Sequence, residues 1–204
     1  MTPITLYTNP QSRGRIAHWM IEEVGVPYRA EFLDYGPAMK TAAFLAINPM
    51  GKVPTLVHGE AVVTEAAAIC AYLADAFPEA ELAPAPGARA AYYRWMFFAA
   101  GPLEAAVTNR TLGVDVPAER RSMVGYGAFE TVMDTMERAL EAGPYIAGSF
   151  FTAADVYFGS QIGWGLRFGS IEARPAFREY WERLAGRPAL ARANAANEAA
   201  MAGA

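Results

Sequence analysis

Several features that would direct a chain to a particular role are scarce in this sequence. It holds one cysteine in 204 residues, which excludes an internal disulfide and is typical of a reducing compartment. No apolar run reaches the roughly 18 residues of a membrane span, and no signal peptide is evident at the N-terminus. Basic residues form no block and the net charge is −4. We therefore expect a cytoplasmic protein whose partners include neither nucleic acid nor membrane.

Metal-binding patterns are also missing. The two histidines, His18 and His58, have no metal-ligand spacing, so we expect no metal site and place both at the surface or in turns. Cys70 has no second cysteine three residues away and falls on the apolar side of an expected helix. We interpret it as a buried structural thiol.

The composition is rich enough in apolar residues, at 53%, for one or two small domains with real cores. Strand and helix patterns alternate in the first part of the chain. The expected strands are 4–7, 28–33, 53–57 and 61–63, and the expected helices are 13–24, 41–47 and 65–76. This order, βαβ-α-ββα, predicts a thioredoxin-like domain of α/β class, with a mixed four-stranded sheet and helices on both faces.

The second part of the chain predicts helices alone. A linker rich in proline and acidic residues covers 78–87. The helices expected after it are 88–106, 117–142, 152–168, 175–185 and a short one from 188 that decays into an alanine-rich tail. Thr152 and Asp155 form a capping-box pattern, which we interpret as structural. We therefore expect three parts: a domain at 1–77, the linker, and an all-helical bundle at 88–204.

One stretch organises the first domain. Val53-Pro54 precedes a strand, and because proline cannot donate to a sheet ladder, the main chain of Val53 is expected to stay free for an extended ligand. Thr64 is the expected N-cap of the next helix. Glu65 and Ala66 follow in its first turn, where unpaired N–H groups and the helix dipole favour a carboxylate. The pattern suits a short acidic peptide, although an ordinary hairpin capped by a helix explains it equally well.

Residues 48–56, Asn-Pro-Met-Gly-Lys-Val-Pro-Thr-Leu, followed by Thr-Glu-Ala-Ala-Ala-Ile at 64–69, resemble the glutathione-binding signature of the cytosolic glutathione S-transferase family. The resemblance extends over the whole chain in length and order of elements. It implies that Pro54 is cis, that the Val53 main chain pairs with the cysteinyl unit of glutathione, and that Glu65 and Ala66 hold its γ-glutamyl end. The family usually has serine at the position of Ala66, so weaker capture is expected.

Two lysines are candidates for the glycine carboxylate of glutathione. Lys52 belongs to the signature and is preferred over Lys40, a loop residue. No metal or redox cofactor is implied, so glutathione is the only co-substrate expected.

Conjugation requires the thiolate, and a free thiol with a pKa near 8.5 is only a few per cent ionised at neutral pH. The sulfur should therefore lie between Tyr7 and Arg15, where the first strand gives way to a helix N-terminus. We favour Ser12, the position at which theta-like and many bacterial members carry serine, then Asn9, with Arg15 as electrostatic support. Tyr7 is the fourth candidate. Each has a structural alternative: N-cap for Ser12, turn-former for Asn9, solvated charge for Arg15 and core packing for Tyr7.

The second substrate is expected to be a small hydrophobic electrophile. Candidate walls of its pocket in the helical domain are Trp95, Phe98, Pro102 and Trp164, although aromatic residues at helical spacing more often belong to a core. The resemblance implies a detoxifying transferase and a homodimer. Two alternatives stay open: glutathione-dependent disulfide reduction, favoured if Asn9 faces the sulfur, and a non-catalytic ligand-binding or stress protein with the same fold.

Overall fold

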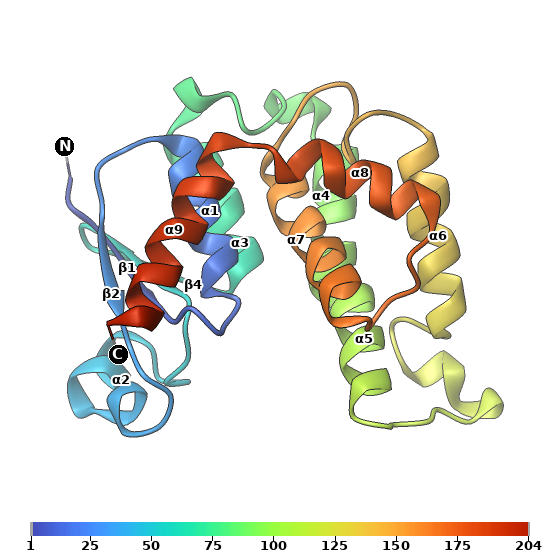
Figure 1. Ribbon diagram of the computed structural model, residues 1–204, viewed down its shortest axis with the longest axis horizontal. Coiled ribbons are helices and arrows are strands. Elements are labelled where there is room, and N and C mark those ends of the chain that lie inside the picture. The colour runs from blue at the N-terminus through green and yellow to red at the C-terminus, as the bar shows by residue number, and fades with distance from the viewer. Residues whose placement is uncertain (1, 204) are drawn as a thin grey trace. The chain divides into compact units, whose positions relative to one another are not determined.

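The computed structural model describes residues 2–203 of the chain. The chain folds into two compact units, shown in Figure 1. One comprises Met1–Leu82 together with Gly186–Ala204, and the other comprises Ala83–Ala185. Within residues 2–203, no helix has both the length and the apolarity needed to cross a membrane.

The first unit is built on a mixed four-stranded sheet. Its strands are β1 (Ile4–Thr8), β2 (Arg29–Phe32), β3 (Thr55–His58) and β4 (Ala61–Thr64), in the order β2-β1-β3-β4. β1 and β2 are parallel, as a βαβ crossover requires, whereas β3 runs antiparallel to both β1 and β4. This arrangement confirms the thioredoxin-like fold that the sequence predicts.

Helices pack on this sheet because successive residues of a strand alternate between buried and less buried positions. Ile4, Leu6 and Thr8 of β1 are buried, and α1 (Gly14–Val24) and α3 (Ala66–Ala76) contact the strands and each other. The intervening Tyr7 is half-buried, and its ring lies 5.4 Å from that of Phe44 in α2 (Ala42–Ile47). Gly25 ends α1 in a left-handed conformation with φ 75°, as its position after the apolar stripe predicts.

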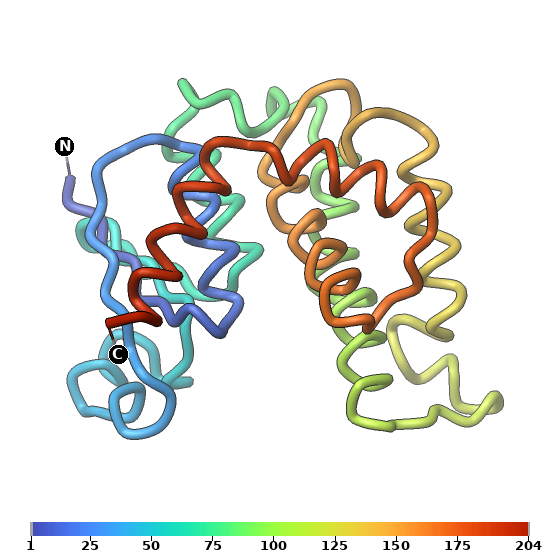
Figure 2. The backbone as a smooth tube through the Cα atoms, viewed as in Figure 1, coloured from blue at the N-terminus to red at the C-terminus, as the bar shows by residue number. Residues whose placement is uncertain are grey.

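The C-terminal segment differs from expectation. α9 (Pro188–Ala202) is a regular helix rather than a decaying tail, and it packs along α1, as the tube in Figure 2 shows. Ala189, Ala193 and Asn197, spaced four residues apart, form its buried face. Small side chains at this spacing let one helix lie close to another. Residues 186–204 therefore belong to the first unit, which differs from the expected helical domain at 88–204.

The second unit is helical, as predicted. Its α-helices are α4 (Ala90–Phe98), α5 (Glu104–Thr111), α6 (Phe129–Glu141), α7 (Ala153–Phe168) and α8 (Pro175–Ala185). The long helix expected from 88 is divided by a π-helical segment, Ala99–Leu103, that contains Pro102. Proline lacks the N–H that an α-helix needs, and such segments widen the helix locally.

The helix expected over 117–142 is wrong in its first half. Residues Ala118–Met123 form 3₁₀ turns, and only Phe129–Glu141 is an α-helix. Gly127 between them adopts φ 66°, a left-handed conformation that an α-helix cannot continue through.

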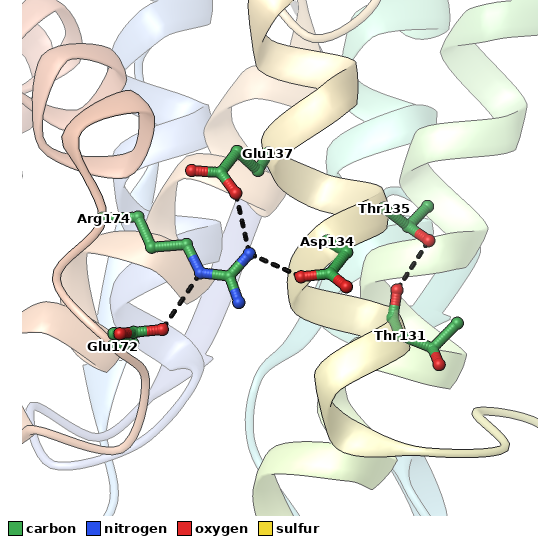
Figure 3. A network of polar contacts seen from close by, with 6 residues as sticks. All are labelled: Thr131, Asp134, Thr135, Glu137, Glu172 and Arg174. Atoms are coloured by element: carbon green, nitrogen blue, oxygen red, sulfur yellow. Dashed lines mark hydrogen bonds and ion pairs between the residues drawn. The ribbon is translucent and has the colours of Figure 1, made fainter.

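Arg174 fixes the entry to α8, and Figure 3 shows its contacts. Its guanidinium donates to Asp134 and Glu137 of α6, both at 2.8 Å, and to Glu172 at 3.1 Å. The hydrogen bonds that Arg174 donates to Asp134, Glu172 and Glu137 raise the pKa of the guanidinium. Within α6, the Thr135 hydroxyl donates to the carbonyl of Thr131 at 2.7 Å.

Candidate functional site

Strand register gathers the residues that the signature predicts at one end of the sheet. Thr55, the first residue of β3, pairs with Tyr7 near the end of β1 and with Thr64, the last residue of β4. Three segments therefore meet at the same end of the sheet: the loop after β1, the segment before β3 and the start of α3. The three pieces come from distant parts of the sequence, and the antiparallel pairing brings them together.

Asn9 has a structural task in the loop after β1. Its amide nitrogen donates to the Leu33 carbonyl at 2.8 Å, and its amide oxygen accepts from the Gln11 N–H at 2.8 Å. The side chain is buried and connects this loop to the end of β2. Both halves of the amide are thus engaged by main-chain groups.

Ser12 lies just before α1 and is half-buried. Its hydroxyl donates to the Asn9 carbonyl at 2.8 Å and accepts from the N–H of Gly14, the first residue of α1, at 2.9 Å. The hydroxyl therefore binds the N–H of the first helical residue, but the N-cap position belongs to Arg13 and not to Ser12, so the N-cap alternative is wrong in its residue. Ser12 is the side chain among the four candidates that sits directly at this positive end.

Thr8 is a residue that sequence reasoning missed. It is fully buried, and its hydroxyl has no hydrogen-bond partner in the part of the chain that the structure describes. A Cβ atom on Gly14 would lie 2.1 Å from this hydroxyl oxygen and 2.8 Å from that of Ser12. Both hydroxyls thus pack against the bare Cα of Gly14. The last position of a strand, beside the expected sulfur site, was the available signal.

Arg15 and Tyr7 both make contacts that stabilise the first unit. The Arg15 guanidinium donates to the Pro10 carbonyl at 3.3 Å and to the Asn194 side chain of α9 at 2.8 Å. It holds the loop and α9 in place while keeping its charge one turn beyond Ser12. Tyr7 packs on Phe44 in the first unit, as its structural alternative predicts.

The segment before β3 has the expected form. The Val53–Pro54 peptide is cis, and Val53 precedes the first residue of the β3 ladder. Asn48 is buried, and its amide donates to the Lys52 carbonyl at 2.8 Å and to the Thr55 hydroxyl at 3.0 Å. These hydrogen bonds stabilise the loop that precedes Val53 in the sequence.

The two lysines are now distinguished. The Lys40 ammonium donates to the carbonyls of Met50 and Gly51, both at 3.1 Å, so it fastens the signature loop. The Lys52 side chain is exposed at the edge of the same loop. Lys52 is therefore the better placed of the two for an anionic ligand.

The start of α3 requires a correction. Thr64 is the last residue of β4, and Glu65 occupies the N-cap position without capping the helix through its side chain. Glu65 is exposed and adopts φ 67°, which is uncommon for a residue with a side chain. Strained backbone of this kind is often found at ligand sites. Ala66 follows as the first residue of the helix and is buried.

The candidate wall residues of the second unit have different surroundings. Trp95 is buried, with ring centroids 5.4 Å from Phe98 and 6.1 Å from Phe158, so it contributes to the core. Phe98, Pro102 and Trp164 are half-buried. Thr152 and Asp155 form the predicted capping box, and the buried Asp155 also accepts from the Tyr180 hydroxyl at 2.8 Å.

The remaining polar candidates are internal. Cys70 is fully buried, and burial raises the pKa of its thiol, which makes it unreactive. The expectation for His18 is wrong: it is buried in α1, and its Nε2 lies 2.7 Å from the Tyr28 hydroxyl. His58 is half-buried in β3 and stacks on Phe77. The burial of His18 could not be predicted from the apolar stripe of its helix, because its partner Tyr28 lies on the segment that follows the helix.

Comparison with known proteins agrees with this geometry. The family described as "Glutathione S-transferase, N-terminal domain" matches residues 2–75. Glutathione S-transferase 3 of Zea mays is 30% identical, over 96% of this chain and 95% of its own. A glutathione transferase structure from Methylococcus capsulatus superposes with a TM-score of 0.78 at 28% identity, covering 96% of this chain and 98% of its own. A theta class transferase of Xanthomonas axonopodis, with glutathione bound, gives 0.75 at 29% identity, covering 95% and 97%. The chain belongs to the glutathione S-transferase family.

Proposed function

We propose that this glutathione S-transferase joins the thiol of glutathione to small hydrophobic electrophiles, at the sheet edge where β1, β3 and α3 meet. The observation that carries the proposal is the register of Thr55 with Tyr7 and Thr64. That register supports a site in which the main chain of Val53 lies beside the start of α3 and the loop that holds Ser12. A peptide-docking edge, an anion site and a hydroxyl at a helix N-terminus then serve one ligand.

Each part of glutathione has a complementary group in this site. The main chain of Val53 pairs with the cysteinyl unit, in the manner of strand addition. The Glu65 carboxylate takes the ammonium of the γ-glutamyl unit, and the N–H groups at Ala66 take its carboxylate. The exposed ammonium of Lys52 faces the glycine carboxylate. The Xanthomonas axonopodis relative was solved with glutathione bound, which supports glutathione as the ligand.

Ser12 activates the thiol in this proposal. Lowering a thiol pKa by two units takes about 2.7 kcal/mol of differential stabilisation. The Ser12 O–H, which donates to the Asn9 carbonyl at 2.8 Å, turns to the sulfur instead, while the Gly14 N–H keeps the hydroxyl oxygen in place. Arg15 adds positive potential. Asn9 is disfavoured as the donor because both halves of its amide are engaged.

The chemical step is a transfer to carbon. The thiol gives its proton to solvent, and the thiolate forms a C–S bond with the electrophilic carbon. In a substitution the leaving group departs with its bonding electron pair; in an addition the neighbouring carbon takes up a proton. Phe98, Pro102 and Trp164, each half-buried in the second unit, are the candidates for apolar contact with the electrophile. Such a reaction serves detoxification.

We also infer a cytoplasmic homodimer. On α4, Phe97 exposes 68% of its surface and Tyr93 exposes 41%, and their rings are 6.4 Å apart. Residues four positions apart share one helix face, so this is an apolar stripe suited to a second copy. The single buried cysteine fits a reducing cytoplasm.

Turnover of 1-chloro-2,4-dinitrobenzene with glutathione tests the proposal. Ser12→Ala should lower kcat by roughly 100-fold, as removal of one donor to a developing anion does, and should abolish the thiolate absorbance of the bound glutathione. Ser122→Ala, at an exposed serine of the second unit, is the matched control. Unchanged thiolate absorbance in Ser12→Ala would exclude Ser12 as activator. Tight binding without turnover on several electrophile classes, or disulfide reduction alone, would contradict the proposed reaction.

A further inference from the structure

One contact of α9 reaches the loop that holds the proposed thiol activator. Nη2 of Arg15 donates to the side-chain oxygen of Asn194 at 2.8 Å, and Nη1 donates to the main-chain carbonyl of Pro10 at 3.3 Å. Pro10 lies inside the turn that the Ser12 N–H closes onto the Asn9 carbonyl at 3.1 Å. The Arg15 guanidinium is therefore fixed between α9 and the loop that joins β1 to α1.

Both of these acceptors are neutral groups. An amide oxygen and a main-chain carbonyl orient the guanidinium of Arg15, but they do not cancel its charge as a carboxylate would. The charge acts on its surroundings, because it contributes to the lowered pKa of His18, one turn further along α1. An anion that forms at the start of α1 would meet the same positive charge.

The acceptor at this end of the helix contact differs from those at the other end. Arg187 pairs with Glu23, and Arg192 pairs with Glu22, so two arginines of the C-terminal segment bind carboxylates of α1. Beside the loop the arrangement is reversed, since α1 supplies the arginine and α9 supplies an uncharged amide. The carboxylate contacts explain how α9 is fastened to α1, whereas the amide holds a charge that it leaves in place.

The surroundings of Asn194 favour a fixed geometry. Asn194 and Arg15 are both half-buried, which limits the access of water to their hydrogen bond. Ala193, the preceding residue, and Asn197, one turn further on, are buried. The position of the Asn194 main chain is thus set by the packing of α9. A charge that is oriented before a thiolate forms requires little reorganisation when the anion develops.

We propose that Asn194 is a positioning residue for glutathione transfer, which holds the Arg15 guanidinium beside the loop between β1 and α1 so that its charge stabilises the thiolate. This inference rests on the proposed function. Asn194 acts through Arg15 and does not need to contact glutathione. The C-terminal helix then contributes to the chemistry as well as to stability.

The pKa of the thiol of bound glutathione, followed by thiolate absorbance from pH 5 to 9, tests this role. Asn194→Ala should raise that pKa by about 0.5 unit, because the guanidinium is no longer held in place. Turnover of 1-chloro-2,4-dinitrobenzene at low glutathione should fall about threefold at pH 6 and little at pH 9, where the thiolate is formed in both proteins. In an Arg15→Gln background, Asn194→Ala should have no further effect.

Asn194→Asp separates positioning from simple attachment of the helix. The carboxylate keeps an oxygen acceptor for Arg15 and forms a stronger, charge-assisted hydrogen bond, so the urea midpoint should not decrease. It also cancels the charge of the guanidinium, so the thiol pKa should increase by about one unit. A contact that served only stability would leave the thiol pKa of this variant unchanged.

Two controls complete the design. Arg192→Ala removes another contact between α9 and α1 and should leave the thiol pKa as it is. Affinity for S-hexylglutathione, which has no free thiol, should be the same in Asn194→Ala and the natural chain. The inference is overturned if both Asn194 variants keep the natural thiol pKa, or if Arg192→Ala raises it equally. If Ser12→Ala alone raises it, the proposed function stands without this inference; if the natural chain forms no thiolate, both are overturned.

Discussion

Arg187 and Glu23 form a bidentate ion pair that fastens the beginning of α9 to α1. Nε of Arg187 lies 2.6 Å from one carboxylate oxygen of Glu23 and Nη2 lies 2.8 Å from the other. The Glu23 side chain is only 6% exposed and also accepts from the Trp19 indole at 2.7 Å. Paired geometry and shelter from water distinguish this contact from an ordinary surface salt bridge.

Arg187→Ala should therefore lower the free energy of unfolding by about 2–3 kcal/mol, because it leaves a nearly buried carboxylate without its cation. The matched control is Arg192→Ala, which removes the neighbouring pair with Glu22. Arg192 is 54% exposed, so its loss should cost no more than about 1 kcal/mol. Urea denaturation of both variants measures the difference. Equal losses would show that α9 is not held chiefly at Arg187.

His18 gives stability a pH dependence. It is buried in α1 beside Tyr28, and burial lowers its pKa below 6.5, against the raising effects of Asn197 and Glu22 and with a lowering effect of Arg15. Tyr28 in turn donates to Glu22 at 2.6 Å, and Arg192 pairs with Glu22. The folded protein thus holds His18 neutral at a pH where the unfolded chain begins to protonate it.

The sign follows from this difference. Between the lowered folded pKa and the unfolded value near 6.5, the unfolded chain binds more protons, so stability falls as the pH decreases through 6.5. Below the folded pKa this effect levels off. Glu22 also has a lowered pKa, since the hydrogen bonds from Tyr28 and Arg192 outweigh burial, but its contribution is lost at lower pH, below 4.5.

Urea unfolding at pH 8, 7 and 6 should accordingly show decreasing stability for the natural chain. His18→Gln should flatten this slope, whereas His58→Gln, which removes the other histidine, should retain it. The same slope in His18→Gln would assign the pH dependence to other groups.

The sequence predicts the local parts of the site well and their partners poorly. The hairpin, the segment at Val53 and the capping box of Thr152 and Asp155 follow from short patterns, and the structure confirms them. The engagement of Asn9 could not be foreseen, because its acceptor is the Leu33 carbonyl, 24 residues away. Glu65 in place of Thr64 as the N-cap depends on a backbone conformation that glycine would ordinarily signal.

The two largest errors in the predicted helices, in the C-terminal tail and over 117–128, have the same origin. The alanine-rich tail has a weak apolar stripe, yet α1 supplies the surface on which α9 forms. Helical propensity over 117–128 is overridden by Gly127, whose φ of 66° becomes visible only in the fold. Local preference is a weak prior where tertiary contacts decide.

Gly14 is a position where the site and the fold share one constraint. A methyl group there would lie 2.1 Å from the Thr8 hydroxyl oxygen and 2.8 Å from that of Ser12. Gly14→Ala should therefore displace both hydroxyls, lower the free energy of unfolding by about 1–3 kcal/mol and reduce turnover of 1-chloro-2,4-dinitrobenzene. Gly87→Ala, with nothing within 4 Å of the added carbon, is the control. A fully active Gly14→Ala variant would show that Ser12 takes no part in the reaction.

Ala66 permits a gain-of-binding test of the glutathione assignment. It is the first residue of α3 and keeps a main-chain N–H there, but it lacks the hydroxyl that the family usually places at this position. Ala66→Ser would add one donor to the γ-glutamyl carboxylate, and a hydrogen bond to a charged group contributes about 1.5–3 kcal/mol. We expect the KM for glutathione to fall by about tenfold, the lower end of that range.

The kcat should change little in Ala66→Ser, because the added hydroxyl is directed to the γ-glutamyl end and not to the sulfur. Ala68→Ser, at an exposed position of the same helix, controls for the general effect of serine in α3. Steady-state kinetics with glutathione as the varied substrate, at fixed electrophile, separates the two parameters. An unchanged KM, or a change confined to kcat, would mean that the start of α3 does not hold the γ-glutamyl carboxylate, and the orientation of glutathione proposed here would have to be reversed.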